Sequence, residues 1–103
     1  MRRNVVLFQN SEQGGFPVPE LSRFFGIIIT MYSSDHNPPH FHAEYGGQEA
    51  LFDIVNGVFL KGSLPSKEAR LVLAWYEIHK DELLQNWANL SSGKAHSKIA
   101  PLS

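Results

Sequence analysis

Residues 40 to 55 have the sequence HFHAEYGGQEALFDIV, and this stretch decides the fold. Polar and apolar side chains alternate from His40 to Tyr45, which is typical of a strand with one buried face. Gly46-Gly47 then indicates a tight turn, because glycine adopts the positive φ angles of two-residue hairpin loops. A second strand from Gln48 to Val55 follows. The stretch therefore predicts a β-hairpin.

The segments on either side of this hairpin predict two more strands. Residues Phe24 to Tyr32 are rich in β-branched and aromatic side chains, which favours a strand buried on both faces. Asn56-Gly57 indicates a second hairpin turn, and Val58 to Lys61 follows it as a short strand. We therefore expect a four-stranded antiparallel meander.

A helical region follows the meander and begins at Leu64-Pro65-Ser66, since proline is well tolerated at the first helical position. Apolar and aromatic residues at helical spacing form two stripes: Leu71, Trp75 and Ile78 in one, and Val72, Tyr76, His79, Leu83, Trp87 and Leu90 in the other. The stripes are displaced by about 100° at 3.6 residues per turn. We expect either one helix in a wide groove or, preferably, a bent or broken helical layer that changes direction near residues 79 to 81. Gly93 ends the helical region, and residues 97 to 102 form an extended tail.

The fold class that these elements predict is α+β, with the helical layer packed on one face of the sheet. The chain has 103 residues, of which 43% are apolar and 18% charged, as in an ordinary globular domain. We predict a single α+β domain over residues 21 to 103. Residues 1 to 20 form an N-terminal extension with a possible short strand at Val5 to Phe8 and a loop from Gln9 to Glu20.

Charge and cysteine content exclude several classes of function. The net charge of −1 argues against tight unspecific nucleic-acid binding, which needs several Lys and Arg contacts to phosphates. With no cysteine there is no disulfide framework and no thiolate zinc site, which fits a reducing compartment. No stretch approaches the roughly 20 apolar residues needed to span a bilayer. We expect a cytoplasmic protein without a membrane partner.

The candidate chemistry is concentrated between Asp35 and Tyr45, DHNPPHFHAEY, which holds three of the five histidines, two carboxylates and a double proline. Histidine titrates near neutral pH and is the commonest metal ligand. The two prolines restrict their own φ angles and the residues before them. We infer that a stiff turn and the strand after it present the histidines at one site.

Strand alternation places half of these side chains together. Two sets alternate along the strand: His40, His42 and Glu44 on one face, and Phe41, Ala43 and Tyr45 on the other. The apolar set faces the helices, so the histidine set faces outward or lines a cleft. Residues two apart on one face are about 6.6 Å apart, close enough for two imidazoles to converge on one small ligand. A suitable register would add Glu49 and Asp53 of the next strand to the histidine face.

One use of this segment is general acid–base catalysis, for example transfer within a phosphodiester, because imidazoles donate and remove protons. The catalytic candidates are Asp35, His36, His40, His42 and Glu44. Arg23 or Lys61 would hold the phosphate, and Tyr32, which flanks the same turn, is a second substrate-binding candidate.

A second use is a metal site. His36, His40 and His42 are the predicted ligands, with Asp35 or Glu44 as alternatives for the third position. Three protein ligands are the arrangement of catalytic zinc. A third interpretation is structural: Asp35 and His36 cap the turn, His40 bonds to backbone, and His42 fills a half-buried sheet position. The residues leave these three interpretations open, and we expect no cofactor other than such a divalent metal.

The segment from Ser22 to Tyr45 resembles a widespread family of small bacterial proteins of unknown function. The hallmark of that family is the string Asp-His-x-Pro-Pro-His-Phe-His, which stands here at residues 35 to 42. The resemblance continues through the predicted helix and covers about residues 21 to 102.

The resemblance implies one half of a two-gene module, beside a small partner protein encoded nearby. On this basis we expect a toxin-like component that acts on RNA through the histidine cluster. The alternative is a non-enzymatic interaction module that binds its partner through an open sheet edge or the helical layer. A homodimer is a further expectation.

Overall fold

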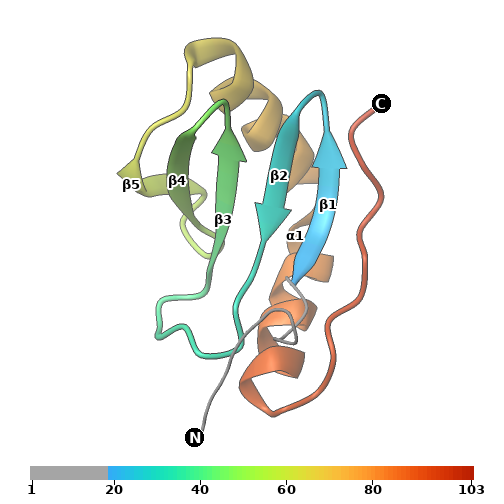
Figure 1. Cartoon of the computed structure of the whole chain (residues 1–103). Coiled ribbons are helices and arrows are strands. Elements are labelled where there is room, and N and C mark those ends of the chain that lie inside the picture. The colour runs from blue at the N-terminus through green and yellow to red at the C-terminus, as the bar shows by residue number, and fades with distance from the viewer. Residues whose placement is uncertain (1–18) are drawn as a thin grey trace, which may run out of the picture.

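The computed structural model describes residues 19 to 103, which form a five-stranded antiparallel sheet followed by one C-terminal helix (Figure 1). The strands are β1 (Glu20–Phe24), β2 (Ile27–Thr30), β3 (His40–Tyr45), β4 (Gln48–Asp53) and β5 (Val58–Gly62), and they pair in chain order. The helix is α1 (Ser66–Ser91). The predicted α+β class is confirmed. The short strand predicted at residues 5 to 8 lies outside the described residues, and Glu20, assigned to the extension, begins β1.

The prediction of four strands is wrong, because the single strand expected from Phe24 to Tyr32 is divided by a hairpin turn at Phe25-Gly26. Both turn residues have positive φ angles, 49° for Phe25 and 80° for Gly26. Glycine is favoured here for a second reason, since a Cβ on Gly26 would lie 3.2 Å from the Tyr45 ring. An apolar residue at the first turn position made this turn look like part of a continuous strand.

The central hairpin forms where the sequence predicts it. His40 pairs with Asp53, His42 with Leu51 and Tyr45 with Gln48, so the turn is Gly46-Gly47. Within β3, Phe41 and Ala43 are fully buried while Glu44 is exposed. The predicted alternation is therefore present, with the apolar face of β3 turned towards the core.

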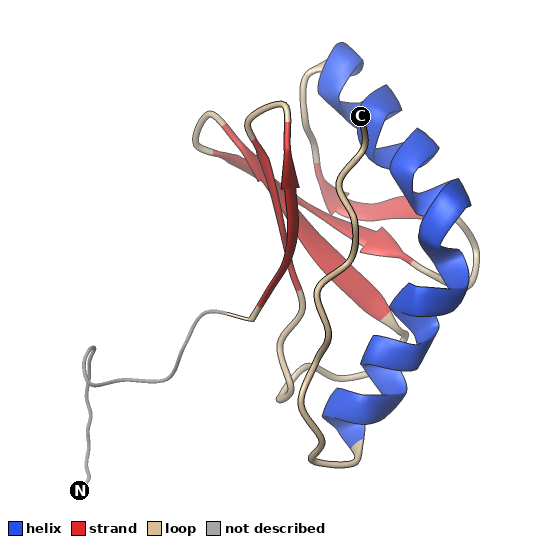
Figure 2. Ribbon diagram, turned by 90° about the vertical axis from the view of Figure 1, so that its right-hand side faces the viewer, coloured by secondary structure: helices blue, strands red, loops and turns tan. Residues whose placement is uncertain are grey.

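Helix α1 covers one face of the sheet and leaves the other face open within the described residues (Figure 2). Trp75 of α1 packs against Phe41 with ring centroids 5.7 Å apart, and Phe41 stacks on Phe52 at 5.1 Å. The helix is a single element, but His79 has non-helical backbone angles (φ −115°, ψ 19°), within the interval where the sequence predicts a bend. No helix within residues 19 to 103 has the length and apolar character needed to cross a bilayer.

The C-terminal tail lies along the outer edge of β1 (Figure 2). The Ile99 N–H donates to the Leu21 carbonyl at 2.8 Å, and the Trp75 indole N–H donates to the Ala100 carbonyl at 2.9 Å. The Asn86 amide both accepts from the Ser97 N–H and donates to the Ser97 carbonyl. One edge of the sheet is thus covered, and the candidate site lies where the β2–β3 loop meets the first residues of β3.

Candidate functional site

The loop between β2 and β3 brings Asp35 to the start of β3. The Asp35 N–H donates to the Tyr32 carbonyl at 3.3 Å, and the Ile54 N–H donates to the Pro39 carbonyl at 3.0 Å. The loop also contains a cis peptide between Asn37 and Pro38. These bonds tie the loop to β4 on one side and to the end of β2 on the other, so that Asp35 lies beside the first residues of β3.

Asp35, His40 and His42 form a compact cluster at this position. The Asp35 Oδ2 atom lies 2.9 Å from His42 Nε2 and 3.2 Å from His40 Nε2. The three candidate ligand atoms are all within 4.8 Å of one another. The side chains are 25%, 11% and 18% exposed in the order Asp35, His40 and His42. The cluster is therefore shielded but still reachable by a small solute.

The contact made by the Nδ1 atom of His40 determines which ring nitrogen carries the hydrogen. His40 Nδ1 lies 2.8 Å from the Pro38 carbonyl oxygen, which only accepts, so Nδ1 carries the hydrogen. In a neutral imidazole the Nε2 atom then has a lone pair, and this lone pair faces the carboxylate of Asp35. Two acceptors at 3.2 Å repel unless a positive centre lies between them, either a proton or a metal ion.

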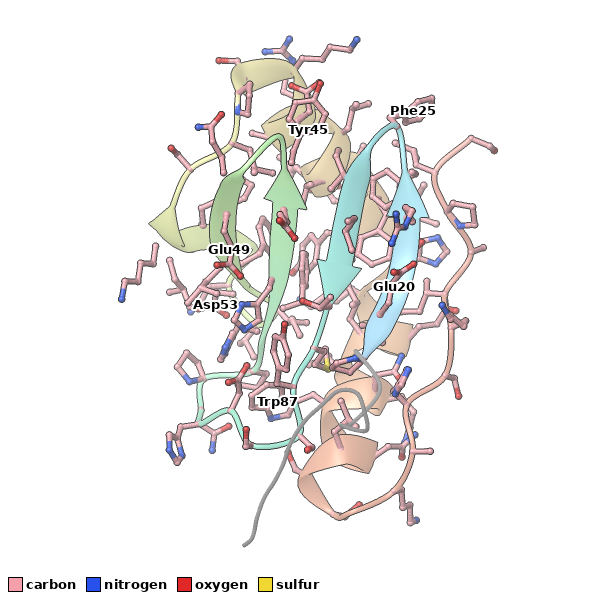
Figure 3. The ribbon with its side chains drawn as sticks, viewed as in Figure 1. Glu20, Phe25, Tyr45, Glu49, Asp53 and Trp87 are labelled. Atoms are coloured by element: carbon pink, nitrogen blue, oxygen red, sulfur yellow. The ribbon has the colours of Figure 1, made fainter. Side chains whose placement is uncertain are left out.

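His42 is held from two sides. Its Nδ1 atom lies 3.0 Å from Glu49 Oε2 of β4, so both ring nitrogens face carboxylate oxygens. The Tyr32 ring contacts the His42 ring edge-on at 4.9 Å, and the Trp87 ring packs against His40 at 5.3 Å. Figure 3 labels Glu49, which belongs to β4, and Trp87, which belongs to α1. These contacts fix the directions in which the two imidazoles point.

Two of the predicted catalytic residues lie outside the cluster. His36 is exposed and is not part of the group that Asp35, His40 and His42 form within the described residues. Glu44 is exposed further along β3, where it pairs with Ile28 and Glu49 across the sheet. The sequence offered Asp35 and Glu44 as alternatives to His36 for the third ligand. Of these two, Asp35 is the residue that the loop brings to both imidazoles.

The two predicted substrate-binding residues have different positions. Tyr32 contacts His42, as described above. Arg23 donates to Glu20 at 2.8 Å on the exposed surface of β1. This hydrogen bond lowers the pKa of the Glu20 carboxyl and raises the pKa of the Arg23 guanidinium from their usual values. The substrate-binding roles of both residues, like the catalytic roles of the cluster, remain predictions.

The sequence predicted that a suitable strand register would add Glu49 and Asp53 to the histidine face. Of these two acids, only Glu49 contacts a histidine. Asp53 is opposite His40 in the sheet but accepts hydrogen bonds from the backbone of Val55 and Asn56. The Asn56 backbone bond is the main reason that the pKa of Asp53 is lowered, with the neighbouring His40 as a smaller cause. The contact of His40 with the Pro38 carbonyl agrees with the structural interpretation, in which His40 bonds to backbone. The contact of His40 with Trp87 has no signal in the sequence, because it depends on how the helix packs.

Two of the three ligand-atom separations in the cluster are close to those of a first-row metal site. Metal bonds to histidine nitrogen and carboxylate oxygen are about 2.0 to 2.2 Å long. Neighbouring ligand atoms are then about 3.0 to 3.4 Å apart at octahedral or tetrahedral angles. The two separations from Asp35 Oδ2, 2.9 and 3.2 Å, are close to this range, whereas the three atoms together span up to 4.8 Å. The residues present therefore fit a divalent ion once the two imidazole nitrogens move closer together.

A family model matches residues 26 to 88, which include β2 to β5 and most of α1. The chain belongs to the family described as Domain of unknown function (DUF4160). The DUF4160 match confirms a family without an assigned function and is shorter than the predicted range of 21 to 102. The chain has no significant match among curated proteins or among solved structures.

Proposed function

We propose that this domain binds one divalent transition-metal ion through Asp35, His40 and His42. The observation that carries the proposal is the convergence of two imidazole Nε2 atoms on one carboxylate oxygen, at 2.9 and 3.2 Å. A divalent ion at the centre replaces the facing lone pairs with three favourable bonds. The same ion balances the negative charge of Asp35 in a shielded position, where an unpaired charge is costly.

The outer contacts of both histidines support the same proposal. Metal-bound histidines usually donate their second N–H to a carbonyl or carboxylate, which fixes the tautomer and the ring orientation. His40 has such a partner in the Pro38 carbonyl, and His42 has one in Glu49. Both rings are therefore held with Nε2 directed at the same point before any metal arrives.

The ligand set indicates which metals and which chemistry to expect. Imidazole nitrogens with one carboxylate suit zinc and iron(II) better than magnesium or calcium, which prefer oxygen ligands. Three protein ligands leave at least one coordination position for water or a substrate. A bound ion would polarise a molecule held there. The aromatic rings of Tyr32 and Trp87, which contact the two histidines, would limit competing water.

A metal titration tests the proposal directly. Protein purified without a histidine tag and stripped with chelator is titrated with Co²⁺ and Zn²⁺, followed by visible absorption and calorimetry. We expect one ion per chain. Asp35→Asn, His40→Ala and His42→Ala should each weaken binding more than about 100-fold, beyond the effect of losing an outer contact.

His36→Ala is the matched control, because it removes a histidine from the same loop without touching the cluster. It should bind metal like the parent protein, and circular dichroism should show all four variants folded. A stoichiometry far below one ion per chain would contradict the proposal. Equal losses from His36→Ala and His42→Ala would instead favour the three-histidine ligand set that the sequence predicted.

Protons provide the competing explanation, since an imidazolium at His40 and at His42 would also satisfy the contacts to Asp35. That state favours the acid–base interpretation over the metal. It predicts no metal uptake, and nitrogen NMR of the rings would show hydrogen on both nitrogens of each histidine. The titration and the NMR spectrum together separate the two states.

A toxin-like role on RNA has less support than metal binding. The phosphate anchor that it assigns to Arg23 is engaged with Glu20, and the net charge of −1 gives no overall attraction to RNA. Binding of a small partner protein and formation of a homodimer likewise remain predictions. RNA cleavage by the pure protein, compared with His42→Ala, tests the RNA-directed role.

A further inference from the structure

A shallow depression of about 280 Å³ lies beside His42 on the open face of the sheet. It is lined by His42, Glu49, Ala50, Leu51, Lys61 and Gly62. Small-molecule sites range from about 300 to 1,000 Å³, so this depression suits a ligand of only a few heavy atoms. The sides of the depression carry charged and polar groups, whereas Leu51 forms part of its lining between them.

We propose that, once the metal site is loaded, this depression binds a small oxyanion (a phosphate or carboxylate group) with Lys61 as its anchor. The inference rests on the proposed metal-binding function. It adds a class of ligand to that function and assigns a role to a residue outside the metal cluster.

The sheet register places Lys61 on the same side as His42. Leu51 pairs with His42 on one side and with Lys61 on the other, and directly paired residues share a face. Neighbouring strands are about 4.8 Å apart, so the two backbones are about 10 Å apart. Lys61 and His42 both line the depression, with Leu51 paired between them. This spacing suits one small anion between the two side chains.

Gly62 holds the neighbouring backbone close to the depression. A Cβ at this position would lie 2.2 Å from the backbone oxygen of Glu49, so no larger residue fits without displacement of β5. Its φ angle of 73° also favours glycine. The position of Lys61 relative to β4 is therefore fixed by a close contact between two backbones.

Lys61 is free to bind a ligand. Within residues 19 to 103 it has no salt-bridge partner, although Glu49 lines the same depression. Glu49 is engaged by His42 at 3.0 Å instead. A lysine ammonium is a compact point charge that commonly binds phosphate in proteins.

The charge of the site makes anion binding depend on metal. With neutral imidazoles, the carboxylates of Asp35 and Glu49 outweigh the ammonium of Lys61 by one negative charge, which repels an anion. A divalent ion changes the balance to one net positive charge. Two further acids lie on this face: Glu44, which lies near Arg23, and Asp53, whose carboxylate accepts hydrogen bonds from the backbone of Val55 and Asn56. The metal-loaded site therefore attracts an anion that the metal-free site excludes.

Anion titrations of the whole protein test this inference. Inorganic phosphate and acetate are titrated separately into Co²⁺-loaded and metal-free protein, with calorimetry and the cobalt absorption bands as readouts. We expect binding only in the loaded form, and weaker binding at higher salt. Lys61→Ala should weaken it about tenfold, the effect of losing one charge-assisted contact, without changing the cobalt affinity. Comparison of the two anions shows whether the site prefers phosphate or carboxylate.

Lys67→Ala is the control, because Lys67 is an exposed lysine on α1; it should bind the anion like the parent protein. Equal binding by Lys61→Ala and the parent overturns the inference, as does equal binding with and without metal, or no anion binding to protein that holds one cobalt ion. These outcomes leave the metal-binding function intact. Failure of the chain to take up cobalt removes that function and the inference with it.

Discussion

The two faces of β3 have opposite roles in this domain, although their residues alternate along six positions. On the inner face, Phe41 and Ala43 are fully buried, and Phe41 contacts Phe52 and Trp75. On the outer face, His40 and His42 are held by hydrogen-bond acceptors from the preceding loop and from β4. The inner face stabilises the fold through buried apolar surface, whereas the outer face directs ring nitrogens at a common point.

The two faces hold their side chains in place through different kinds of interaction. Apolar contacts are non-directional, so the inner face requires the right volume. Hydrogen bonds are directional, so the outer face requires particular atoms at particular distances. A substitution on one face should therefore change stability, and a substitution on the other should change ligand affinity.

The largest expected effect is on the inner face. Phe41→Ala should lower the free energy of unfolding by about 3 to 5 kcal/mol, because it leaves a cavity between Phe52 and Trp75. His42→Ala should change it by less than about 1 kcal/mol, since that side chain is partly exposed and its partners regain water. Urea unfolding of the metal-free variants measures both values. Similar losses from the two substitutions would break the distinction between the faces.

The second-largest expected effect is a change in metal affinity caused by a substitution on the outer face. Glu49→Gln should weaken metal binding about tenfold, because a neutral amide makes His42 less basic than a carboxylate does. The free energy of unfolding of the metal-free variant should equal that of the metal-free parent protein. Glu44→Gln is the matched control, since Glu44 pairs with Glu49 across the sheet and contacts neither histidine in the described cluster. Equal metal affinities of both variants and the parent would rule out this role of Glu49.

The smallest expected effect is on the free energy of unfolding and concerns Asp53, an acid beside the cluster that stabilises the folded state. The lowered pKa of Asp53 means that its ionised form stabilises the folded state. This contribution is fully present above the unfolded-state pKa of about 3.9 and is lost as the pH falls through the lower folded-state pKa. Asp53→Asn should thus cost about 1 kcal/mol at pH 7.

The stability difference between Asp53→Asn and the parent protein should shrink as the pH falls below about 4. Urea unfolding at pH 7 and pH 3 measures it, and the metal affinity at pH 7 should be unchanged. A constant difference at both pH values would show that the carboxylate charge of Asp53 does not contribute to stability, contrary to its bonds with Val55 and Asn56.

Prediction from the sequence succeeded where local patterns were sufficient. Alternation of side chains and the turn at Gly46-Gly47 predicted the central hairpin and the histidine face of β3. The first hairpin was missed because Phe25 occupies a turn position with φ 49°, which a bulky apolar residue rarely adopts. Propensity alone favoured one continuous strand there, and the pairing of β1 with β2 overrode it.

The loop marks the limit of prediction for the site. Its composition indicated a stiff turn with an acid and a histidine next to each other, so His36 was the predicted third ligand and Asp35 an alternative. The choice between them depends on the direction of the loop backbone. That direction is set by contacts with distant segments, including the bond between the Pro39 carbonyl and the Ile54 N–H.

Local sequence patterns were sufficient to predict the α+β class, the central hairpin and the shared face of His40 and His42, because these follow from periods of two and 3.6 residues and from glycine turns. Tertiary structure alone decided that Asp35 joins the two imidazoles while His36 stays exposed. It also decided that Glu49 supports His42 whereas Asp53 bonds to its own turn. These outcomes depend on distances between atoms of separate segments, and no local pattern encodes such distances.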